Sequence, residues 1–194
     1  MQGPPKPRWN YFTIGNKESL LFLPTHQPPP NSVELDMETG MPEVVAIFTT
    51  GEPGGSLLSV AEATLERGKG LVGDRYYNGK GTFSHQLKFS RDWEITLIES
   101  EEIERFNSLE LFAFSPAEFR RNIVTSGVRL NSLVDRRFSV GSAVLAGIRL
   151  CEPCAHLAKF IGPASVKSLA HRAGLRARIL SGGVVRPGDR ITEP

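Results

Sequence analysis

The pattern of apolar and polar positions predicts a chain built mainly of short β-strands. Strict alternation over Trp93–Ile98 predicts a half-buried strand, and the β-branched run Val44–Thr49 predicts another. Residues Val60–Leu65 and Leu175–Leu180 also alternate, and the second of these segments places its arginines on one face. Further strands are expected at Asn122–Thr125, Phe138–Val140, Ser142–Leu150 and Arg190–Thr192.

Short helices are predicted between these strands. The acidic segment Glu99–Phe106 has a helical pattern, and Ser115–Glu118 has the capping-box spacing with proline at the first helical position. Two further helices, Ala155–Ile161 and Ser165–Ala170, are expected on either side of a break at Gly162-Pro163. Many short strands joined by glycine and proline turns predict a mostly β fold with a few short helices, arranged as a barrel or a sandwich.

The N-terminal residues 1–42 differ in composition from the rest of the chain. They hold eight of its 14 prolines, and the run Pro28-Pro29-Pro30 favours polyproline II over a packed helix. We expect an irregular arm over residues 1–42, followed by a single domain over residues 43–194. A proline-rich ligand for another protein is an alternative interpretation of the arm.

Composition excludes several classes of protein. The chain is 40% hydrophobic and 23% charged, which is ordinary for a globular domain. It contains no apolar run near the roughly 20 residues that span a bilayer, and its N-terminus has no apolar core of the signal-peptide kind. We therefore expect a cytoplasmic protein with no membrane contact. Two cysteines in 194 residues do not form a disulfide scaffold.

Charge is distributed unevenly along the chain. Residues Glu43–Glu118 carry 7 lysines and arginines against 13 acidic residues, whereas Phe119–Pro194 carry 13 against 4. Eleven of those 13 are arginines, whose planar guanidinium suits bidentate recognition of phosphate or carboxylate. The second half lacks the alternation of aromatic and basic residues typical of nucleic-acid binding. It therefore favours a small anionic ligand over nucleic acid, with a solvated basic face as the alternative.

The two cysteines lie in one short segment, Cys151-Glu-Pro-Cys154. Pro153 ends the preceding strand, so that Cys154 stands directly before a helix start, where backbone N–H groups favour a thiolate. A buried, unreactive thiol is the competing interpretation for Cys154, and the favoured one for Cys151. A zinc site would be incomplete, because only His156 and His171 lie near in sequence. The segment also lacks the βαβ context of a thioredoxin-like pair.

Arginines close to predicted strands are candidates for binding the anion. One arginine of Arg120-Arg121-Asn122 could hold a phosphate, while Asn122 supplies both a donor and an acceptor. Arg176 and Arg178 share a strand face at about 7 Å, which is costly unless an anion or solvent separates them. Arg75 either pairs with the aspartate before it or joins the anion site. The sequence shows no recognisable Ser/His/Asp catalytic triad.

A set of motifs in fixed order resembles the MOSC domain, which is named for the C-terminal part of molybdenum cofactor sulfurases. The resemblance extends over roughly Glu43–Thr192 and leaves out the proline-rich arm. The motifs are Gly73-Asp74-Arg75, Ile95–Glu99, Arg120–Thr125, Gly141 through Cys151-Glu152-Pro153-Cys154, and His171–Ala177.

The resemblance implies a β-rich, barrel-like fold that binds molybdenum cofactor, a pterin (molybdopterin) with a phosphate and a metal held by a dithiolene. The family's cysteine, which binds molybdenum or carries sulfur, matches Cys154. The Arg-Asn pair of the family's strand motif matches Arg121 and Asn122. A thiolate suits molybdenum, and the basic half of the chain suits the phosphate. The expected cofactor-binding residues are Arg75, Arg121, Asn122, His171, Arg176 and Arg178.

The resemblance also implies a reaction. Single-domain bacterial members are associated with the reduction of N-hydroxylated compounds, with electrons from a separate reductase. This chain has no cysteine set for an iron–sulfur cluster, so as an oxidoreductase acting on a small molecule it would need such a partner. One alternative is a sulfur carrier, with a persulfide on Cys154 loaded by a separate cysteine desulfurase, since no pyridoxal phosphate domain is expected in this chain. A non-catalytic binding module is another.

Two positions depart from the family pattern. Ala173 stands where the motif would have another glycine, which bears on how closely the backbone approaches a ligand there. Cys151 is additional to the single cysteine that the family needs. A disulfide between Cys151 and Cys154 would block metal ligation.

Overall fold

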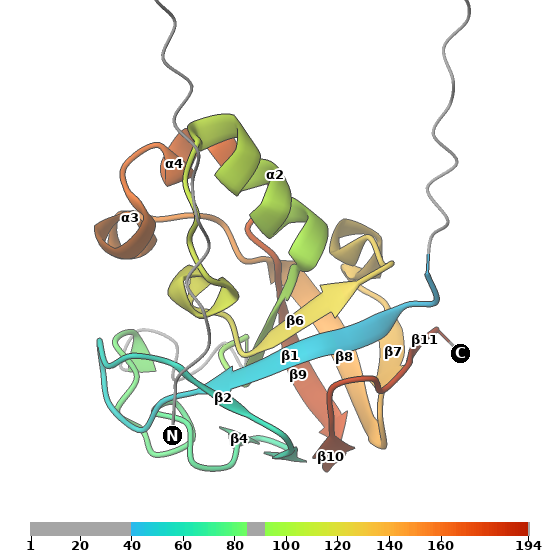
Figure 1. Cartoon of the computed structure of the whole chain (residues 1–194). Helices are drawn as coiled ribbons and strands as arrows, with labels where there is room; N and C mark the ends of the chain where they lie inside the picture. The colour runs from blue at the N-terminus through green and yellow to red at the C-terminus, as the bar shows by residue number, and fades with distance from the viewer. Residues whose placement is uncertain (1–39, 85–91, 194) are drawn as a thin grey trace, which may run out of the picture. The chain divides into compact units, whose positions relative to one another are not determined.

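Two β-sheets organise the computed structural model of the chain, which describes residues 40–84 and 92–193 (Figure 1). In these residues, the larger sheet has eight strands in the order β11 (Ile191–Thr192), β7 (Arg137–Val140), β8 (Ala143–Leu150), β9 (Leu175–Ser181), β5 (Ile95–Glu99), β6 (Ile123–Ser126), β1 (Glu43–Thr49) and β2 (Leu58–Val60). The smaller sheet has the order β10 (Gly183–Val185), β3 (Ala63–Glu66) and β4 (Gly70–Leu71).

Short helices join the strands, as the sequence predicts. They are α2 (Ser100–Glu110), α3 (Ala155–Ile161), α4 (Ser165–Ser168) and the 3-10 helices η1 (Pro116–Phe119) and η2 (Leu130–Leu133). Strands β5 and β6 are parallel, which requires a crossover connection, and α2 with η1 provides it. The capping box at the start of η1 forms as predicted, because the Ser115 N–H donates to Glu118 Oε2 at 2.8 Å.

The central strands are buried on both faces because helices cover one side of the larger sheet (Figure 1). Leu97 and Ile123 pack into one core, between the larger sheet and the smaller one. Their neighbours Ile98 and Val124 pack into a second core with residues of α2, α3 and η1, among them the fully buried Phe106. The predicted strand at Trp93–Ile98 thus starts only at Ile95, and its alternation gives way to burial on both sides.

Most of the predicted elements are confirmed within a residue or two. The helix predicted to end at Phe106 continues to Glu110, and the single strand predicted at Val60–Leu65 is wrong. The chain turns at residues 61–62, so that β2 pairs with β1 in the larger sheet while β3 pairs with β10 and β4 in the smaller one. Alternation alone does not reveal such a break, because both halves keep a two-residue period.

The prediction of a barrel is not confirmed. The mostly β fold is observed, but the larger sheet runs open from β11 to β2. An isolated bridge between Glu43 and Arg190, with the Val44 N–H donating to Asp189 O at 2.9 Å, brings the start of β1 near β11. These contacts do not continue as a ladder of paired residues, so the strands do not form a closed barrel.

The expected arm, residues 1–42, lies almost entirely outside the described residues. Within the described ranges, no helix combines the length and the apolar content needed to cross a bilayer.

Candidate functional site

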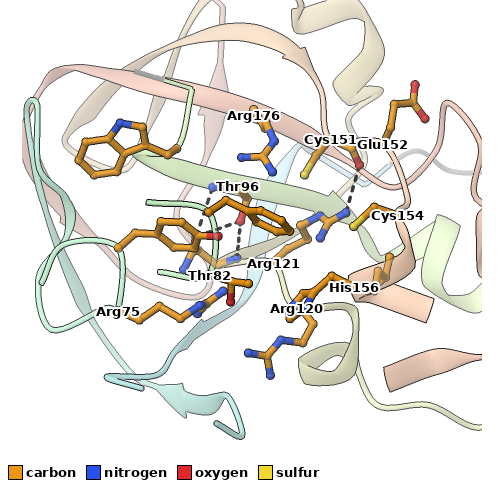
Figure 2. A pocket seen from close by; sticks show the side chains of 15 residues that line it. Arg75, Thr82, Thr96, Arg120, Arg121, Cys151, Glu152, Cys154, His156 and Arg176 are labelled. Carbon is orange, nitrogen blue, oxygen red and sulfur yellow. Dashed lines mark hydrogen bonds between the residues drawn. The ribbon is translucent and has the colours of Figure 1, made fainter. Parts of the chain in front are cut away.

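A pocket of about 590 Å³, including its open mouth, lies where the helices meet one end of the central strands (Figure 2). Its walls come from β5, the turn before β6, the segment between β8 and α3, the start of β9 and the loop after β4. The lining residues are Arg75, Tyr76, Thr82, Phe83, Trp93, Thr96, Arg120, Arg121, Asn122, Cys151, Glu152, Cys154, His156, Leu157 and Arg176.

Both cysteines line this pocket, and both are free thiols. Cys154 is exposed and extended (φ −146°, ψ 169°), and its carbonyl accepts the Ala158 N–H at 3.0 Å as α3 begins. Cys151 is 2% exposed, and its backbone N–H donates to Gly174 O at 2.7 Å. The disulfide considered from the sequence is therefore not formed, and Cys154 presents the accessible thiol.

Arg121 lines the pocket but holds its walls together. It is 7% exposed, and its guanidinium donates to three backbone carbonyls. Nε donates to Ala173 O at 2.8 Å and Nη1 to Phe119 O at 3.1 Å. Nη2 donates to Cys151 O at 3.1 Å (Figure 2). These carbonyls belong to the last residue of η1, the cysteine segment and the turn before β9, so Arg121 fixes the cysteine segment against the other two.

Asn122 is also engaged within the protein. Its Oδ1 accepts from Thr96 Oγ1 at 2.9 Å and from the Thr96 N–H at 3.3 Å. Its Nδ2 donates to Phe48 O at 3.4 Å and to Asp74 Oδ2 at 3.3 Å. The same Asp74 oxygen accepts from Arg75 Nη1 at 3.2 Å. The side-chain amide thus has no free donor in this structure and instead ties the pocket floor together.

Arg75 carries a buried positive charge beside Tyr76. It is 7% exposed, and its guanidinium lies over the Tyr76 ring at 5.0 Å. Burial raises the pKa of Tyr76 above its ordinary value of 10.0, so the phenol keeps its proton at neutral pH. The pair therefore offers a cation and a neutral hydroxyl donor to the pocket.

Among the described residues that line the pocket, Arg120 is the one with buried side-chain donors that lack a hydrogen-bond partner. It is 8% exposed and adopts a left-handed backbone (φ 64°), and its guanidinium lies over the Phe160 ring at 4.3 Å. Nη1 donates to Gly55 O at 2.7 Å, but Nε and Nη2 are buried without a hydrogen-bond partner among the described residues. Burial, together with the positive charge of Arg75, lowers the pKa of Arg120 to about 10.

A buried guanidinium with unpaired N–H groups destabilises the folded state, because these groups lose their hydration without gaining hydrogen bonds. Buried polar groups in proteins are therefore almost always paired. No carboxylate of the described residues forms an ion pair with Arg120 within 4.0 Å, whereas Arg75 has Asp74. An anion in the pocket would supply the missing acceptor. The buried cation therefore indicates where a ligand with negative charge would bind.

His156 lies between aromatic rings on the same side of the pocket. Its ring makes edge contacts with Phe83 and Phe160, at centroid distances of 5.6 and 5.3 Å. Burial and the positive charge of Arg120, with smaller effects of Lys159 and Arg75, lower its pKa below the ordinary 6.5. The imidazole is therefore neutral at neutral pH, and it does not add to the positive charge.

Arg176 lines the pocket, but Arg178 does not. Arg176 Nη1 donates to Asp92 O at 3.3 Å, and the Asp92 carboxylate accepts from Arg149 Nε at 2.6 Å. Arg178 is two residues further along β9, exposed and in register with Ala146 of β8. The predicted pair on one strand face is thus real, but only its first member reaches the site.

His171 also lies outside the pocket lining. Its side chain is 79% exposed, and Nδ1 lies 2.7 Å from Glu152 Oε1. Its backbone N–H donates to Glu152 Oε2 at 2.9 Å. Because Glu152 stands between the two cysteines, these contacts connect His171 to the cysteine segment.

The structure also brings to the pocket residues that were not among the expected cofactor-binding residues. Arg120 was one of two adjacent arginine candidates, and it differs from Arg121 in its left-handed backbone. Thr96 alternates with buried residues of β5, which is a readable signal for a side chain on the opposite face. Tyr76 and His156 reach the pocket through loop geometry that no sequence period records.

The described residues contain no group of three or more His, Cys, Asp or Glu side chains able to hold a metal ion. The pocket therefore offers a metal one exposed thiol, with other ligands to come from a bound group. Its chemistry is that of a soft sulfur donor beside buried arginines.

Comparison with known proteins gives a family and a fold. A family model described as MOSC domain matches residues 84–192. The YuaD protein from Bacillus subtilis has a similar structure, with a TM-score of 0.65, 18% identity and coverage of 78% of this chain and 94% of that one. YiiM from Geobacillus stearothermophilus has a TM-score of 0.61, 18% identity and coverage of 79% and 75%. YiiM from Escherichia coli has a TM-score of 0.56, 19% identity and coverage of 78% and 69%. No curated protein matches in sequence.

Proposed function

The chain belongs to the MOSC domain family, and from this premise we propose that it binds molybdenum cofactor and reduces N-hydroxylated compounds. Electrons would come from a separate reductase, and the protein would work in the cytoplasm. Reduction of a hydroxylamine to an amine consumes two electrons and two protons and releases water. When bound, the cofactor would supply the two-electron redox centre for this reaction.

The observation that carries the proposal is the pairing of an exposed thiol with an uncompensated guanidinium in one pocket. Cys154 supplies the soft sulfur donor that molybdenum favours. Arg120 supplies buried N–H groups that lack an acceptor among the described residues. A pterin with a phosphate and a thiol-seeking metal has both of the groups that this pocket leaves unmatched.

The residues present fit the cofactor with distinct roles. Cys154 Sγ would bind the metal, and Arg120 and Arg176 would contact the phosphate. Arg75 adds positive charge, although it also pairs with Asp74 at 3.2 Å. Arg121 and Asn122, which were expected to bind the cofactor, would hold the pocket walls in place.

Two further residues would act on the substrate. The Tyr76 hydroxyl keeps its proton at neutral pH, so it can donate a hydrogen bond to an N-hydroxyl oxygen. His156 has a lowered pKa, so its neutral ring can accept a hydrogen bond or a proton at neutral pH. Phe83 and Phe160 flank His156 and reduce the access of water to that side of the pocket.

A sulfur carrier is the second candidate, because an exposed free thiol suffices to carry a persulfide. In this function, a separate cysteine desulfurase would load Cys154, and Arg120 would stabilise the anionic persulfide or its acceptor. The two candidates share the nucleophilic sulfur and differ in whether a metal is bound.

Metal and pterin content distinguishes the two. The protein would be purified anaerobically from a host with intact cofactor synthesis, and molybdenum and pterin would be measured per chain. We expect near-stoichiometric molybdenum, its loss in Cys154→Ser, and its retention in the matched control Cys151→Ala. Arg120→Met should lower the pterin content.

Folded protein without molybdenum or pterin would refute the oxidoreductase. The same sample would then be examined by mass spectrometry for a persulfide on Cys154, about 32 Da heavier than the thiol. Absence of that adduct after incubation with a cysteine desulfurase and cysteine would contradict the sulfur carrier too, leaving a non-catalytic binding module.

A further inference from the structure

The outer face of strands β7, β8 and β9 carries arginines that the pocket does not use. Arg137 of β7 pairs in register with Ala146 of β8, and Ala146 pairs with Arg178 of β9. Residues in direct register share a sheet face, so both arginines point outward on either side of one alanine. Adjacent strands lie about 4.8 Å apart, which places the two arginine Cα atoms about 10 Å from each other.

Neither of these two arginines has an ion-pair or hydrogen-bond partner for its side chain in residues 40–84 and 92–193. Both are exposed, and neither forms an ion pair or a side-chain hydrogen bond with another described residue. The neighbouring Arg149 differs, since it is held by the Asp92 carboxylate. Like charges on one face of a sheet repel, so a sheet gains nothing by itself from placing them there.

Arg176 extends the pair Arg137 and Arg178 to the mouth of the pocket; these three residues are called the arginine row. Arg178 and Arg176 are alternate residues of β9, and about 7 Å separates such residues along a strand. Arg176 lines the pocket that contains Cys154 (Figure 2). An object bound across Arg137 and Arg178 would therefore lie beside the pocket entrance.

We propose that this face, defined by Arg137, Ala146 and Arg178, is the docking site for an acidic protein that delivers electrons. The proposal rests on the oxidoreductase function above. A partner with surface carboxylates complements the arginine row, and its position at the pocket mouth shortens the path of the electrons. Two reduced one-electron donors are oxidised for each hydroxylamine, which gains two electrons and two protons and leaves as amine and water.

A binding measurement tests the face directly. The probes are a reduced plant-type [2Fe–2S] ferredoxin and a flavodoxin, both of strongly negative net charge, titrated onto the full chain at 30 and 300 mM salt. We expect at least one to bind at low salt, with at least tenfold weaker binding at high salt. Arg137→Glu and the double variant Arg137→Glu/Arg178→Glu should weaken binding by at least tenfold. The matched control Arg67→Glu, an exposed arginine between β3 and β4, should bind as the wild type does.

A second readout separates this proposal from the function on which it rests. Dithionite replaces the protein donor, so reduction of an N-hydroxylated compound by dithionite should proceed equally in wild type and in Arg137→Glu. Dithionite-driven activity without binding of either probe would overturn the docking site and leave the oxidoreductase intact. Loss of dithionite-driven activity in the wild type would refute the oxidoreductase instead. Equal binding by the Arg67 and Arg137 variants would also overturn the docking site. Tighter binding of a single-stranded oligonucleotide than of either probe, lost in Arg137→Glu, would assign the face to nucleic acid and overturn the protein partner.

Discussion

Replacing Arg121 by methionine should destabilise the protein strongly, because its guanidinium serves the fold. It donates to the carbonyls of Ala173, Phe119 and Cys151 at 2.8, 3.1 and 3.1 Å, and it is 7% exposed. Three hydrogen bonds from a charged donor contribute about 4.5 kcal/mol, taking about 1.5 kcal/mol for each. Each of these values is a net contribution that already includes the desolvation of the donor, so no separate term is subtracted. The expected loss is thus about 4.5 kcal/mol.

Urea unfolding followed by far-UV circular dichroism measures this loss as a lower midpoint at unchanged slope. Arg121→Lys should recover only part of it, because one ammonium cannot reach three carbonyls on separate segments of the chain. Arg137→Met is the control, since an exposed arginine without a partner should cost no more than about 0.5 kcal/mol. A loss below about 1 kcal/mol for Arg121→Met would refute the assignment of Arg121 as a structural clamp.

Other predictions concern titration and charge. Burial raises the pKa of Glu99 above 4.5, so its stabilising contribution is complete below that pH and is lost as pH rises through the folded-state pKa. The stability of Glu99→Gln relative to wild type should therefore increase from pH 4 to pH 7 in urea unfolding, and a constant difference would contradict the raised pKa. Arg120→Met should change the stability of the ligand-free protein by less than about 1 kcal/mol. The substitution removes a buried cation that has lost its hydration and has not gained partners for all of its N–H groups. A loss of about 3 kcal/mol in unfolding would show that Arg120 is structural. The His156 pKa, measured by NMR, should lie below 6.5 in the wild type and rise in Arg120→Met; an unchanged value would mean that Arg120 does not act on it.

The local structure could be predicted because its causes are local. The capping box at Ser115–Glu118, the helix at Ala155–Ile161 and its end at Gly162-Pro163 each depend on a few adjacent residues. The position of Cys154 before a helix follows from Pro153 in the same way. Hydrophobic periods and turn residues act over distances that a sequence displays directly.

The roles of the polar residues could not be predicted, because partners far apart in the chain decide them. Arg121 and Arg120 are adjacent, yet Arg121 donates to three carbonyls, whereas two nitrogens of Arg120 have no hydrogen-bond partner among the described residues. The amide of Asn122 is engaged by Thr96 and Asp74, 26 and 48 residues away. A hydrogen bond depends on distance in space, which sequence order does not give.

The sequence by itself determined a mostly β fold, the short helices, the position of Cys154 before a helix and the basic second half, whereas the structure decided that the Cys154 thiol is exposed. Only the tertiary structure decided that Arg178 and His171 lie outside the pocket while Arg120 lies inside it. Register and loop packing, not residue type, determine which arginine of a strand lines the pocket. The physical reason is that composition fixes how much charge a chain carries, whereas folding fixes which charges are buried and left without a partner.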